Sequence, residues 1–384
     1  MRVLLLGAAG SLLGPVVAAA LTSAGARVVR GHGAGDPPLR SRHYAEYLAH
    51  PPLAEAAALQ DFILGVAREN RETVLLPGND AALLALQPIR HELDRLMPVA
   101  APPPEVIAIA LDKTRTMALA ASVEDGLLPP PTITPEDAED AVASWSGLWP
   151  VVVKPRTGTG TEGIRLARDA AELREAYALV AASYERPLVQ MAVPFDIERK
   201  FHLFYLFDHE GRLRSWYGQR NLVEQRSMRL GASGRKIPGG VALHWESWFD
   251  EPLLERGRRV MEAAGWRGMG FIEGAFDRRD GQPYIFEINP RIGGTQALSL
   301  KQGVNFAHDA CLVALGRTPP ERLDFASGVR AKRDPFTLLK TREPGLMLRV
   351  LDPFSTSSIP RLDDPLPLLQ ALWRNLPFRR AAAG

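Results

Sequence analysis

The chain has 384 residues, of which 46% are hydrophobic and 23% are charged, and its formal net charge is +2 at neutral pH. This balance is typical of a folded globular protein of two or three domains and excludes an intrinsically disordered chain. The small net charge argues against a nucleic-acid partner, and the single cysteine, Cys311, excludes an intrachain disulfide and a four-thiolate zinc site. We therefore expect a cytoplasmic protein, and no apolar stretch approaches the roughly 20 residues of a membrane span.

The first hundred residues alternate short apolar strands with helices. A strand at Arg2–Leu6 leads through a Gly-rich turn into a helix from about Pro15 to Ala24, because Pro suits the first helical turn and Gly25 its end. A signal peptide is the alternative interpretation of this segment. The elements predicted next are a strand at 26–30, a helix at 53–69, a strand at 73–76 and a helix at 81–96. The alternation predicts a parallel sheet with helices on both faces.

The Pro-rich stretch 101–104 predicts a domain boundary, after which the pattern changes. The predicted helices are 111–121, 170–182, 253–264 and 306–315, and the predicted strands are 151–153, 188–193, 200–207, 213–217, 269–276 and 283–288. The last two strands are joined by a connection that ends in Asp280-Gly281, which indicates a β-hairpin. From about Arg317 the chain is rich in Pro and Arg and gives the weakest structural signal.

The second strand of this hairpin ends in the most specific motif of the chain. Glu287 and Asn289 are two residues apart, so their side chains share one face of the strand and offer the oxygen ligands that magnesium prefers. Arg291 follows, where a guanidinium can lie beside a phosphate. The partner strand supplies Glu273 and Asp277, of which we prefer Glu273 as the further metal ligand. The alternative interpretation is a half-buried hairpin with a solvated polar face.

A second motif is an apolar strand that delivers Lys154 at its end and continues into a loop rich in glycine and threonine, residues 157–163. Such a loop offers backbone N–H groups and hydroxyls to phosphates. It is not a Walker A motif, because no Gly-Lys-Ser/Thr sequence closes it, and a plain flexible hairpin is the alternative. Lys113, at the start of another helix, is also placed to meet an anion.

Two further segments have both a functional and an ordinary structural interpretation. The apolar strand 188–193 could cover an adenine, and Glu198, beyond the bend that follows, could accept ribose hydroxyls. The turn Gly7–Gly14 is a candidate nicotinamide site, but its spacing is not Gly-x-Gly-x-x-Gly and no acidic residue ends the second strand. We therefore hold an oxidoreductase as the weaker hypothesis.

The order of these motifs resembles that of the ATP-grasp superfamily. It is most similar to carboxylate–amine ligases such as the ATP-binding halves of carbamoyl phosphate synthetase and biotin carboxylase, over roughly residues 1–316. The resemblance implies an α/β fold in which a Rossmann-like parallel-sheet domain precedes a two-lobed ATP-grasp domain. The boundaries that we predict are 1–105 for the first domain, 106–186 for the small lobe with the Gly-rich loop, 187–325 for the lobe with the metal site, and 326–384 for a C-terminal extension.

The resemblance also implies roles for particular residues. Those implied to bind ATP are Lys113, Lys154, Thr157, Gly158, Gly160, Gly163, Gln190, Met191, Val193 and Glu198. Those implied to bind Mg²⁺, or Mn²⁺ in its place, are Glu273, Glu287 and Asn289, and those implied to act in catalysis are Arg291 and Lys154. The family often has Glu where this chain has Gln190, from which we expect weakened rather than lost nucleotide binding.

These roles imply an ADP-forming ligase that converts a carboxylate into an acyl phosphate and joins it to an amine, with small-molecule substrates. A homodimer is a possibility that comes from the family resemblance and not from the residues. The alternative is a regulatory subunit that binds ATP without ligase turnover. A basic stretch, comprising Arg220, Arg226, Arg229, Arg235 and Lys236, is either a loop over the triphosphate or acid, or a solvated surface loop. Substrate specificity is expected from the first domain, this basic stretch and residues 293–296.

Overall fold

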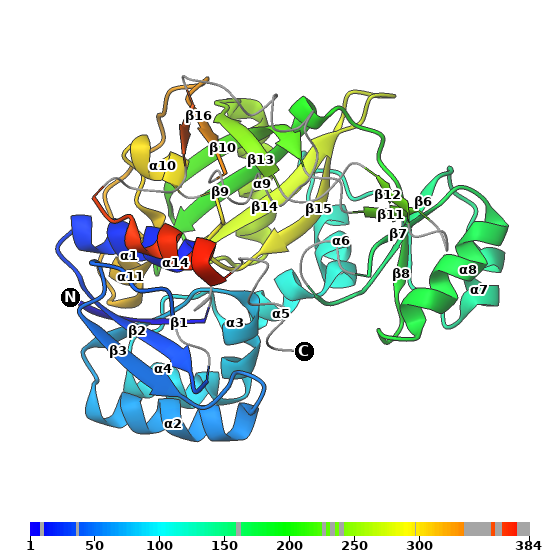
Figure 1. The fold of residues 1–384 in the computed structure, drawn as a ribbon. Coiled ribbons are helices and arrows are strands. Elements are labelled where there is room, and N and C mark those ends of the chain that lie inside the picture. Colours follow the sequence, from blue (N-terminus) through cyan, green and yellow to red (C-terminus); the bar gives the residue numbers. More distant parts are fainter. Residues whose placement is uncertain are drawn as a thin grey trace.

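The computed structural model describes residues 1–7, 11–35, 38–158, 163–224, 242–295, 297–333, 355 and 363–374, and the backbone of 228–230, 235–237 and 356–357. Within these residues the strands form three sheets, of four, seven and six strands (Figure 1). No helix among them is both long enough and apolar enough to cross a membrane.

The four-stranded sheet is parallel, with the order β3-β2-β1-β4. Its strands are β1 (Arg2–Leu6), β2 (Arg27–Gly33), β3 (Glu46–His50) and β4 (Thr73–Pro77), and its helices are α1 (Leu13–Ser23), α2 (Ala56–Glu69), α3 (Asp80–Leu86) and α4 (Arg90–Leu96). On β1, Val3 and Leu5 belong to the core that contains α1, whereas Leu4 and Leu6 belong to the core under α2, α3 and α4. The predicted parallel sheet covered on both faces is therefore confirmed.

Several local predictions differ from the structure. The single helix predicted at 81–96 is broken by a 3₁₀ turn at Gln87–Ile89, because Pro88 lacks the N–H that a continuous helix needs. Likewise α5 (Pro104–Leu111) and α6 (Lys113–Ala121) replace the helix predicted at 111–121. Asp112 lies between them in an extended conformation and caps α6 through Thr114 N. The short edge strand β3 was not predicted.

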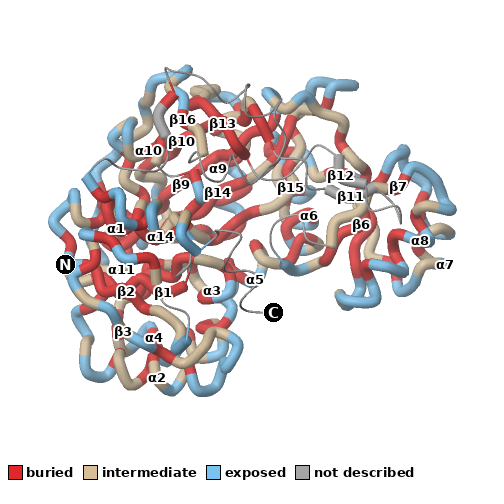
Figure 2. Tube along the Cα trace, viewed as in Figure 1, coloured by how far each residue is buried: buried red, intermediate tan, exposed pale blue. Residues whose placement is uncertain are grey.

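The seven-stranded sheet has the order β15-β14-β9-β10-β13-β16-β17 and provides the centre of the molecule. Its strands are β9 (Lys200–Phe207), β10 (Leu213–Glu224), β13 (Ala242–Ser247), β14 (Gly268–Phe276), β15 (Pro283–Asn289), β16 (Arg330–Lys332) and β17 (Thr356–Ser357). One face carries α5, α6 and α9 (Glu251–Ala263). The other face shares a core with α1, α11 (Phe306–Ala314) and the first sheet, so buried strands run continuously through this region (Figure 2).

The six-stranded sheet has the order β12-β11-β7-β6-β8-β5 and lies beyond β15 (Figure 1). It contains β5 (Thr132–Ile133), β6 (Val151–Lys154), β7 (Arg165–Ala167), β8 (Leu188–Met191), β11 (Met228–Leu230) and β12 (Arg235–Ile237). Helices α7 (Ala138–Ser144) and α8 (Ala170–Ala181) pack on it. Helices α5 and α6 pack on the seven-stranded sheet, whereas β8 pairs with β6 in the six-stranded sheet. The domain boundaries predicted after residues 105 and 186 stay predictions.

Candidate active site

The hairpin of β14 and β15 contains a β-bulge at the candidate site. Glu273 lies directly opposite Glu287, but the next pair joins Gly274 to Ile285, so Phe286 is the extra residue. As a result the consecutive side chains of Phe286 and Glu287 both line one cavity, while Ile285 and Ile288 lie in the core beneath. The bulge thereby adds an apolar ring to the face that carries the carboxylates.

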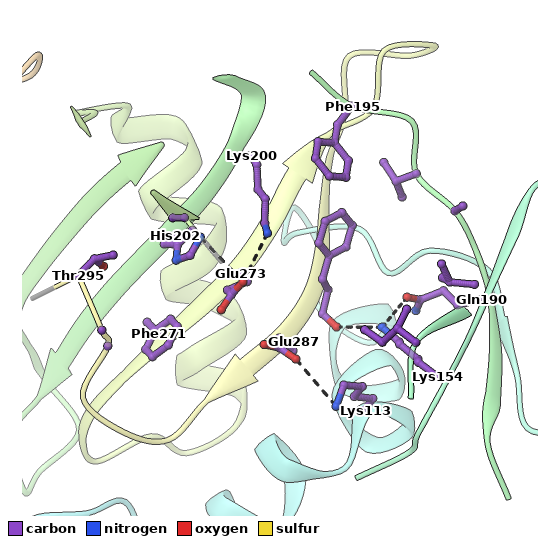
Figure 3. A pocket seen from close by; sticks show the side chains of 18 of the residues that line it. Lys113, Lys154, Gln190, Phe195, Lys200, His202, Phe271, Glu273, Glu287 and Thr295 are labelled. Carbon is purple, nitrogen blue, oxygen red and sulfur yellow. Dashed lines mark hydrogen bonds and ion pairs between the residues drawn. The ribbon is translucent and has the colours of Figure 1, made fainter. Parts of the chain in front are cut away.

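This cavity has a volume of about 370 Å³ and lies where the six-stranded and seven-stranded sheets meet (Figure 3). Its walls come from β6, β8, β9, β13, β14 and β15, together with the first residue of α6, the residue before β7 and the segments after β8, β15 and β16. The residues with predicted roles that line it are Lys113, Lys154, Gln190, Met191, Val193, Glu273, Glu287 and Arg291. The fold thus brings together side chains that are spread over 179 positions, from 113 to 291.

Hydrogen bonds join the segment after β6 to the start of α6, and they place Lys154 and Lys113 side by side. The Arg156 guanidinium donates to Asp112 Oδ2 at 2.8 Å from Nε, and the backbone N–H of Lys113 donates to the Arg156 carbonyl at 3.0 Å. Lys154 Nζ donates to Gln190 Oε1 at 2.8 Å, and Lys113 Nζ donates to the Gly158 carbonyl at 2.9 Å. Burial and the charge of Lys113 lower the pKa of Lys154 to about 7, against the attraction of Glu287. An anion in the cavity would restore its charge.

The two carboxylates repel one another across the hairpin. Burial and the charge of Glu287 raise the pKa of Glu273 above its usual range. Burial also opposes ionisation of Glu287, but the Lys113 ammonium and the hydrogen bond from Asn289 outweigh it and lower the pKa of Glu287. Lys200 Nζ lies 3.9 Å from Glu273 Oε2. A divalent cation between the carboxylates would remove the repulsion.

The donor set fits such a cation with one adjustment. Asn289 directs its Nδ2 toward Glu287 Oε1 at 3.1 Å, while its Oδ1 accepts from Arg291 Nη2 at 3.2 Å. Ligation by Asn289 therefore requires its amide to rotate. Among the described residues there is no cluster of three or more His, Cys, Asp or Glu side chains suited to a metal. The predicted set consists of two glutamates and one amide, and it stays a prediction.

One end of the cavity is lined by apolar side chains. Phe195 and Phe286 lie with their ring centroids 5.8 Å apart at 45°, and Val152, Ile164, Met191 and Val193 complete this part of the lining. A slot between aromatic and aliphatic walls suits a planar ring. It lies next to the two lysines, so a planar ring and an anionic tail could bind together.

Some predicted site residues lie away from the cavity or outside the described residues. Glu198 is exposed on the 3₁₀ turn Ile197–Arg199 and is not part of the lining. Thr157 and Gly158 are exposed where the loop begins, and Gly163 ends it with a φ of +76°, which favours glycine. Gly160 lies outside the described residues, so the roles of all these residues stay predictions.

Two further predicted groups are placed elsewhere. Asp277 forms an ion pair with Arg279 and does not line the cavity. Arg220 pairs with Glu246 at 2.6 Å, and it too lies outside the cavity lining. Residue Arg226 and the side chains of Arg229, Arg235 and Lys236 are not among the described parts of the chain, nor is Gln296.

The sequence analysis missed several residues that the structure places in or next to the cavity. Lys200 and His202 line it from β9, where they are the polar side chains at the start of an otherwise apolar strand. That alternation was a usable signal. Phe195 and Arg333 also line the cavity, and no local pattern marks either of them.

Comparisons with known proteins agree with this architecture. No protein-family model matches the chain. The chain is 23% identical over 268 residues to pyruvate carboxylase from Schizosaccharomyces pombe, covering 68% of this chain and 22% of that protein. It is 25% identical over 162 residues to biotin carboxylase 1 from Bacillus subtilis, covering 41% of this chain and 35% of that protein. The chain thus spans well under two thirds of the length of either relative.

Solved structures with the same fold cover most of the chain. The biotin carboxylase–β,γ-ATP complex from Campylobacter jejuni has a TM-score of 0.65 and 17% identity, over 83% of this chain and 72% of that one. N5-carboxyaminoimidazole synthetase from Staphylococcus aureus has a TM-score of 0.63 and 16% identity, over 83% of this chain and 78% of that one. The L-amino acid ligase from Bacillus licheniformis has a TM-score of 0.59 and 17% identity, over 83% of this chain and 77% of that one. The chain therefore has the ATP-grasp fold, as its resemblance to that superfamily predicted.

Proposed function

We propose that this protein is an ADP-forming ligase that uses MgATP to convert a carboxylate into an acyl phosphate, which then reacts with an amine or similar nucleophile. The observation that carries the proposal is the convergence of Lys113, Lys154, Glu273, Glu287 and Arg291 on one cavity. The names of the proteins with the same fold support it, since they include a biotin carboxylase and an amino acid ligase.

Different residues of the cavity have different roles in phosphoryl transfer. Lys113 and Lys154 hold the phosphates, and the planar base lies in the apolar slot beside Phe195. Glu273 and Glu287, together with Asn289 once its amide rotates, would hold a magnesium ion, which would supply positive charge where two anions must approach each other. Arg291 stabilises the charge on the phosphoryl group during transfer.

The finer parts of the proposal concern substrates and assembly. Both substrates are small molecules, and the names of proteins with this fold suggest hydrogen carbonate or an amino acid as the acid. A homodimer is proposed by analogy with the dimeric biotin carboxylase domain of 2-oxoglutarate carboxylase. The cytoplasmic location expected from the sequence belongs to the same proposal. The four predicted domains, including a C-terminal extension from 326, belong to the same proposal.

Nucleotide product analysis tests the function. The protein is incubated with MgATP and pools of amino acids and small acids that include hydrogen carbonate, together with amine acceptors. We expect acid-stimulated release of ADP and phosphate that is lost in Glu287→Ala and retained in Glu92→Ala. Glu92 is a matched control because it lies on the surface and pairs with Arg68.

Two results would contradict the proposal. Release of AMP and pyrophosphate would exclude the acyl phosphate route. Nucleotide binding with no turnover in any of the pools would favour the regulatory subunit instead. The presence of Lys154, Glu287, Asn289 and Arg291 together argues against that alternative, because a protein that only senses ATP has no need of the residues that transfer its phosphate.

A further inference from the structure

Each carboxylate of the candidate metal site has a lysine at the same distance. Lys113 Nζ lies 3.9 Å from Glu287 Oε2, and Lys200 Nζ lies 3.9 Å from Glu273 Oε2. Both distances are too long for a hydrogen bond but short enough for an ion pair. Lys113 begins α6, whereas Lys200 begins β9 and points toward Glu273 in Figure 3. The carboxylate pair is therefore flanked by two cations that come from different elements of the fold.

Lys200 differs from Lys113 because it has a second and closer carboxylate. Its Nζ lies 2.9 Å from Glu224 Oε1. The side chain of Glu224 has no exposed surface, and only 9% of the Lys200 side chain is exposed. Burial lowers the pKa of Lys200, but the charges of Glu224 and Glu273 outweigh burial and raise that pKa above its ordinary value. Lys200 is therefore charged and lies closer to Glu224 than to Glu273.

Irregular strand pairing places Glu224 beside Lys200. Residues three apart on a regular strand point to opposite faces, yet Asn221 Nδ2 donates a hydrogen bond to Glu224 Oε1. The register of β10 against β13 shifts between Asn221 and Val223, and again between Val223 and Glu224. Shifts of this kind turn a side chain away from the face that the regular alternation gives it. The fold thus departs from a regular ladder at the point where Glu224 meets the lysine.

Stability alone does not explain why this ion pair is buried. Taking two charges out of water costs free energy, and a neutral pair of similar shape is often as stable. The pair has a direction, because the lowering of the Glu273 pKa by Lys200 exceeds its raising by Glu224. The positive end of the pair therefore faces the Glu273 carboxylate.

The charge of the whole cavity favours an anion over a cation. Of the described side chains that line it, those with a positive charge outnumber the carboxylates. The cationic residues are Lys113, Lys154, Lys200, Arg291 and Arg333, and the carboxylates are Glu273 and Glu287. A divalent cation by itself gains little from such surroundings. Phosphate groups would bring both the negative charge and the oxygen ligands that a magnesium ion takes in addition to one or two carboxylates.

We infer that the buried pair of Lys200 and Glu224 makes metal binding at this site depend on bound nucleotide. Lys200 makes Glu273 unfavourable for a free divalent cation, and Glu224 keeps Lys200 from closing onto Glu273 completely. Phosphates beside Lys113 offset the positive charge, so a metal ion binds with the nucleotide or after it. The inference rests on the nucleotide-binding part of the proposed function and adds this order to it. Lys200 and Glu224 are positioning residues that act through Glu273.

Binding of Mn²⁺ to the full chain tests the inference without any turnover. Free Mn²⁺ is counted by its EPR signal, with protein alone and with protein saturated with ADP. The Mn²⁺ that ADP binds in buffer is subtracted. We expect ADP to tighten Mn²⁺ binding by about thirtyfold or more. Because such coupling is reciprocal, Mn²⁺ should tighten ADP binding by the same factor, which isothermal titration of ADP measures.

Two variants should shift the Mn²⁺ affinity in opposite directions. Glu224→Gln keeps a hydrogen-bond acceptor but lets Lys200 move onto Glu273, so Mn²⁺ should bind at least about threefold more weakly, with and without ADP. The double variant Lys200→Met/Glu224→Gln removes both charges with little change of shape. Without ADP it should bind Mn²⁺ about tenfold tighter than the unchanged protein, and the effect of ADP should shrink by a similar factor.

A surface lysine provides the matched control. Lys301 is exposed at the end of α10 (Ala297–Lys301), so Lys301→Met loses one positive charge away from the cavity and should leave the Mn²⁺ affinity unchanged. Melting curves show whether each variant folds. If the pair were only structural, the variants would change Tm without moving the Mn²⁺ affinity in opposite directions, and the inference would be wrong.

The remaining outcomes separate this inference from the proposed function. Coupled binding of Mn²⁺ and ADP without acid-stimulated ADP release would support the inference and overturn the ligase. Acid-stimulated ADP release by a protein that binds Mn²⁺ as tightly without ADP as with it would support the ligase and overturn the inference. If ADP does not bind at all, the inference fails together with the nucleotide site on which it rests.

Discussion

Asp80 and Arg291 form an ion pair with a distance of 2.6 Å between Asp80 Oδ2 and Arg291 Nε, although 211 residues separate them in the chain. Asp80 begins α3 where β4 of the first sheet ends, and Arg291 follows β15 of the seven-stranded sheet. Arg291 also lies over the Phe271 ring, 5.4 Å from its centroid. The start of α3, next to the first sheet, therefore orients the Arg291 side chain that faces the cavity.

We expect Asp80→Asn to lower kcat for acid-dependent ADP release by about tenfold or more and to leave the KM for ATP nearly unchanged. The reason is that the guanidinium loses the anion that orients it, whereas the lysines at the nucleotide end keep their contacts. Steady-state kinetics and a melting curve measure both effects. Asp94→Asn is the control, since Asp94 pairs with Arg90 at 2.8 Å but is 39% exposed. A kcat that falls equally in both variants would show that Asp80 has no special role.

Glu273→Gln should stabilise the metal-free protein at pH 8 by about 2 °C or more in Tm. The native pKa of Glu273 is raised, so between the usual carboxyl pKa and the raised one the native state binds more protons than the unfolded state. Stability is therefore lost as the pH rises through that window, and a neutral side chain avoids the loss. The same variant should lose the extra stabilisation that Mg²⁺ adds to nucleotide. Differential scanning fluorimetry at pH 5 and pH 8, with and without MgADP, tests both parts. A destabilised variant at pH 8 would contradict the prediction.

Nucleotide binding at pH 8 should be accompanied by uptake of up to about one proton by Lys154. Its pKa is lowered to about 7, so the side chain is mostly neutral in the free protein at pH 8, and the phosphate charges favour its protonated form. Affinity for ATP should therefore fall as the pH rises from 7 to 9. Isothermal titration in two buffers with different ionisation enthalpies counts the protons, and Lys154→Met should take up fewer.

Gln190→Glu provides a matched variant for the same titration. Gln190 accepts a hydrogen bond from Lys154 at 2.8 Å, so a carboxylate in its place would raise the lysine pKa. Lys154 would then already be protonated at pH 8, and proton uptake on binding should decrease while the protein still binds nucleotide. If this variant takes up as many protons as the unchanged protein, Lys154 is not the group that titrates.

Gly274→Ala should destabilise the hairpin that carries both carboxylates by about 1–3 kcal/mol. A Cβ at this position would lie 2.2 Å from the Tyr284 carbonyl oxygen and 2.5 Å from the Phe201 ring. Urea unfolding of the variant measures the loss of free energy. Gly65→Ala is the control and should be neutral or slightly stabilising, because it adds a methyl group inside α2 without a clash with any described residue.

Much of the fold could be predicted because local patterns carry it. The strands β1, β4, β9, β14 and β15 were predicted to within one residue at each end, since each is an apolar run bounded by turn residues. Helix interruptions were missed where one residue, such as Pro88 or Asp112, outweighs the periodicity around it. The candidate site was predicted from the order of its motifs rather than from any single one.

By itself the sequence determined the side chains that alternate along one strand, such as Glu287 and Asn289, because a period of two is a property of the strand alone. Only the tertiary structure decided the bulge that turns Phe286 to the same side, since a bulge depends on how two strands pair. The same holds for the lowered pKa of Lys154 and for the Asp80–Arg291 ion pair. Burial and charge at those positions come from segments far apart in the chain, and no local pattern of residues records them.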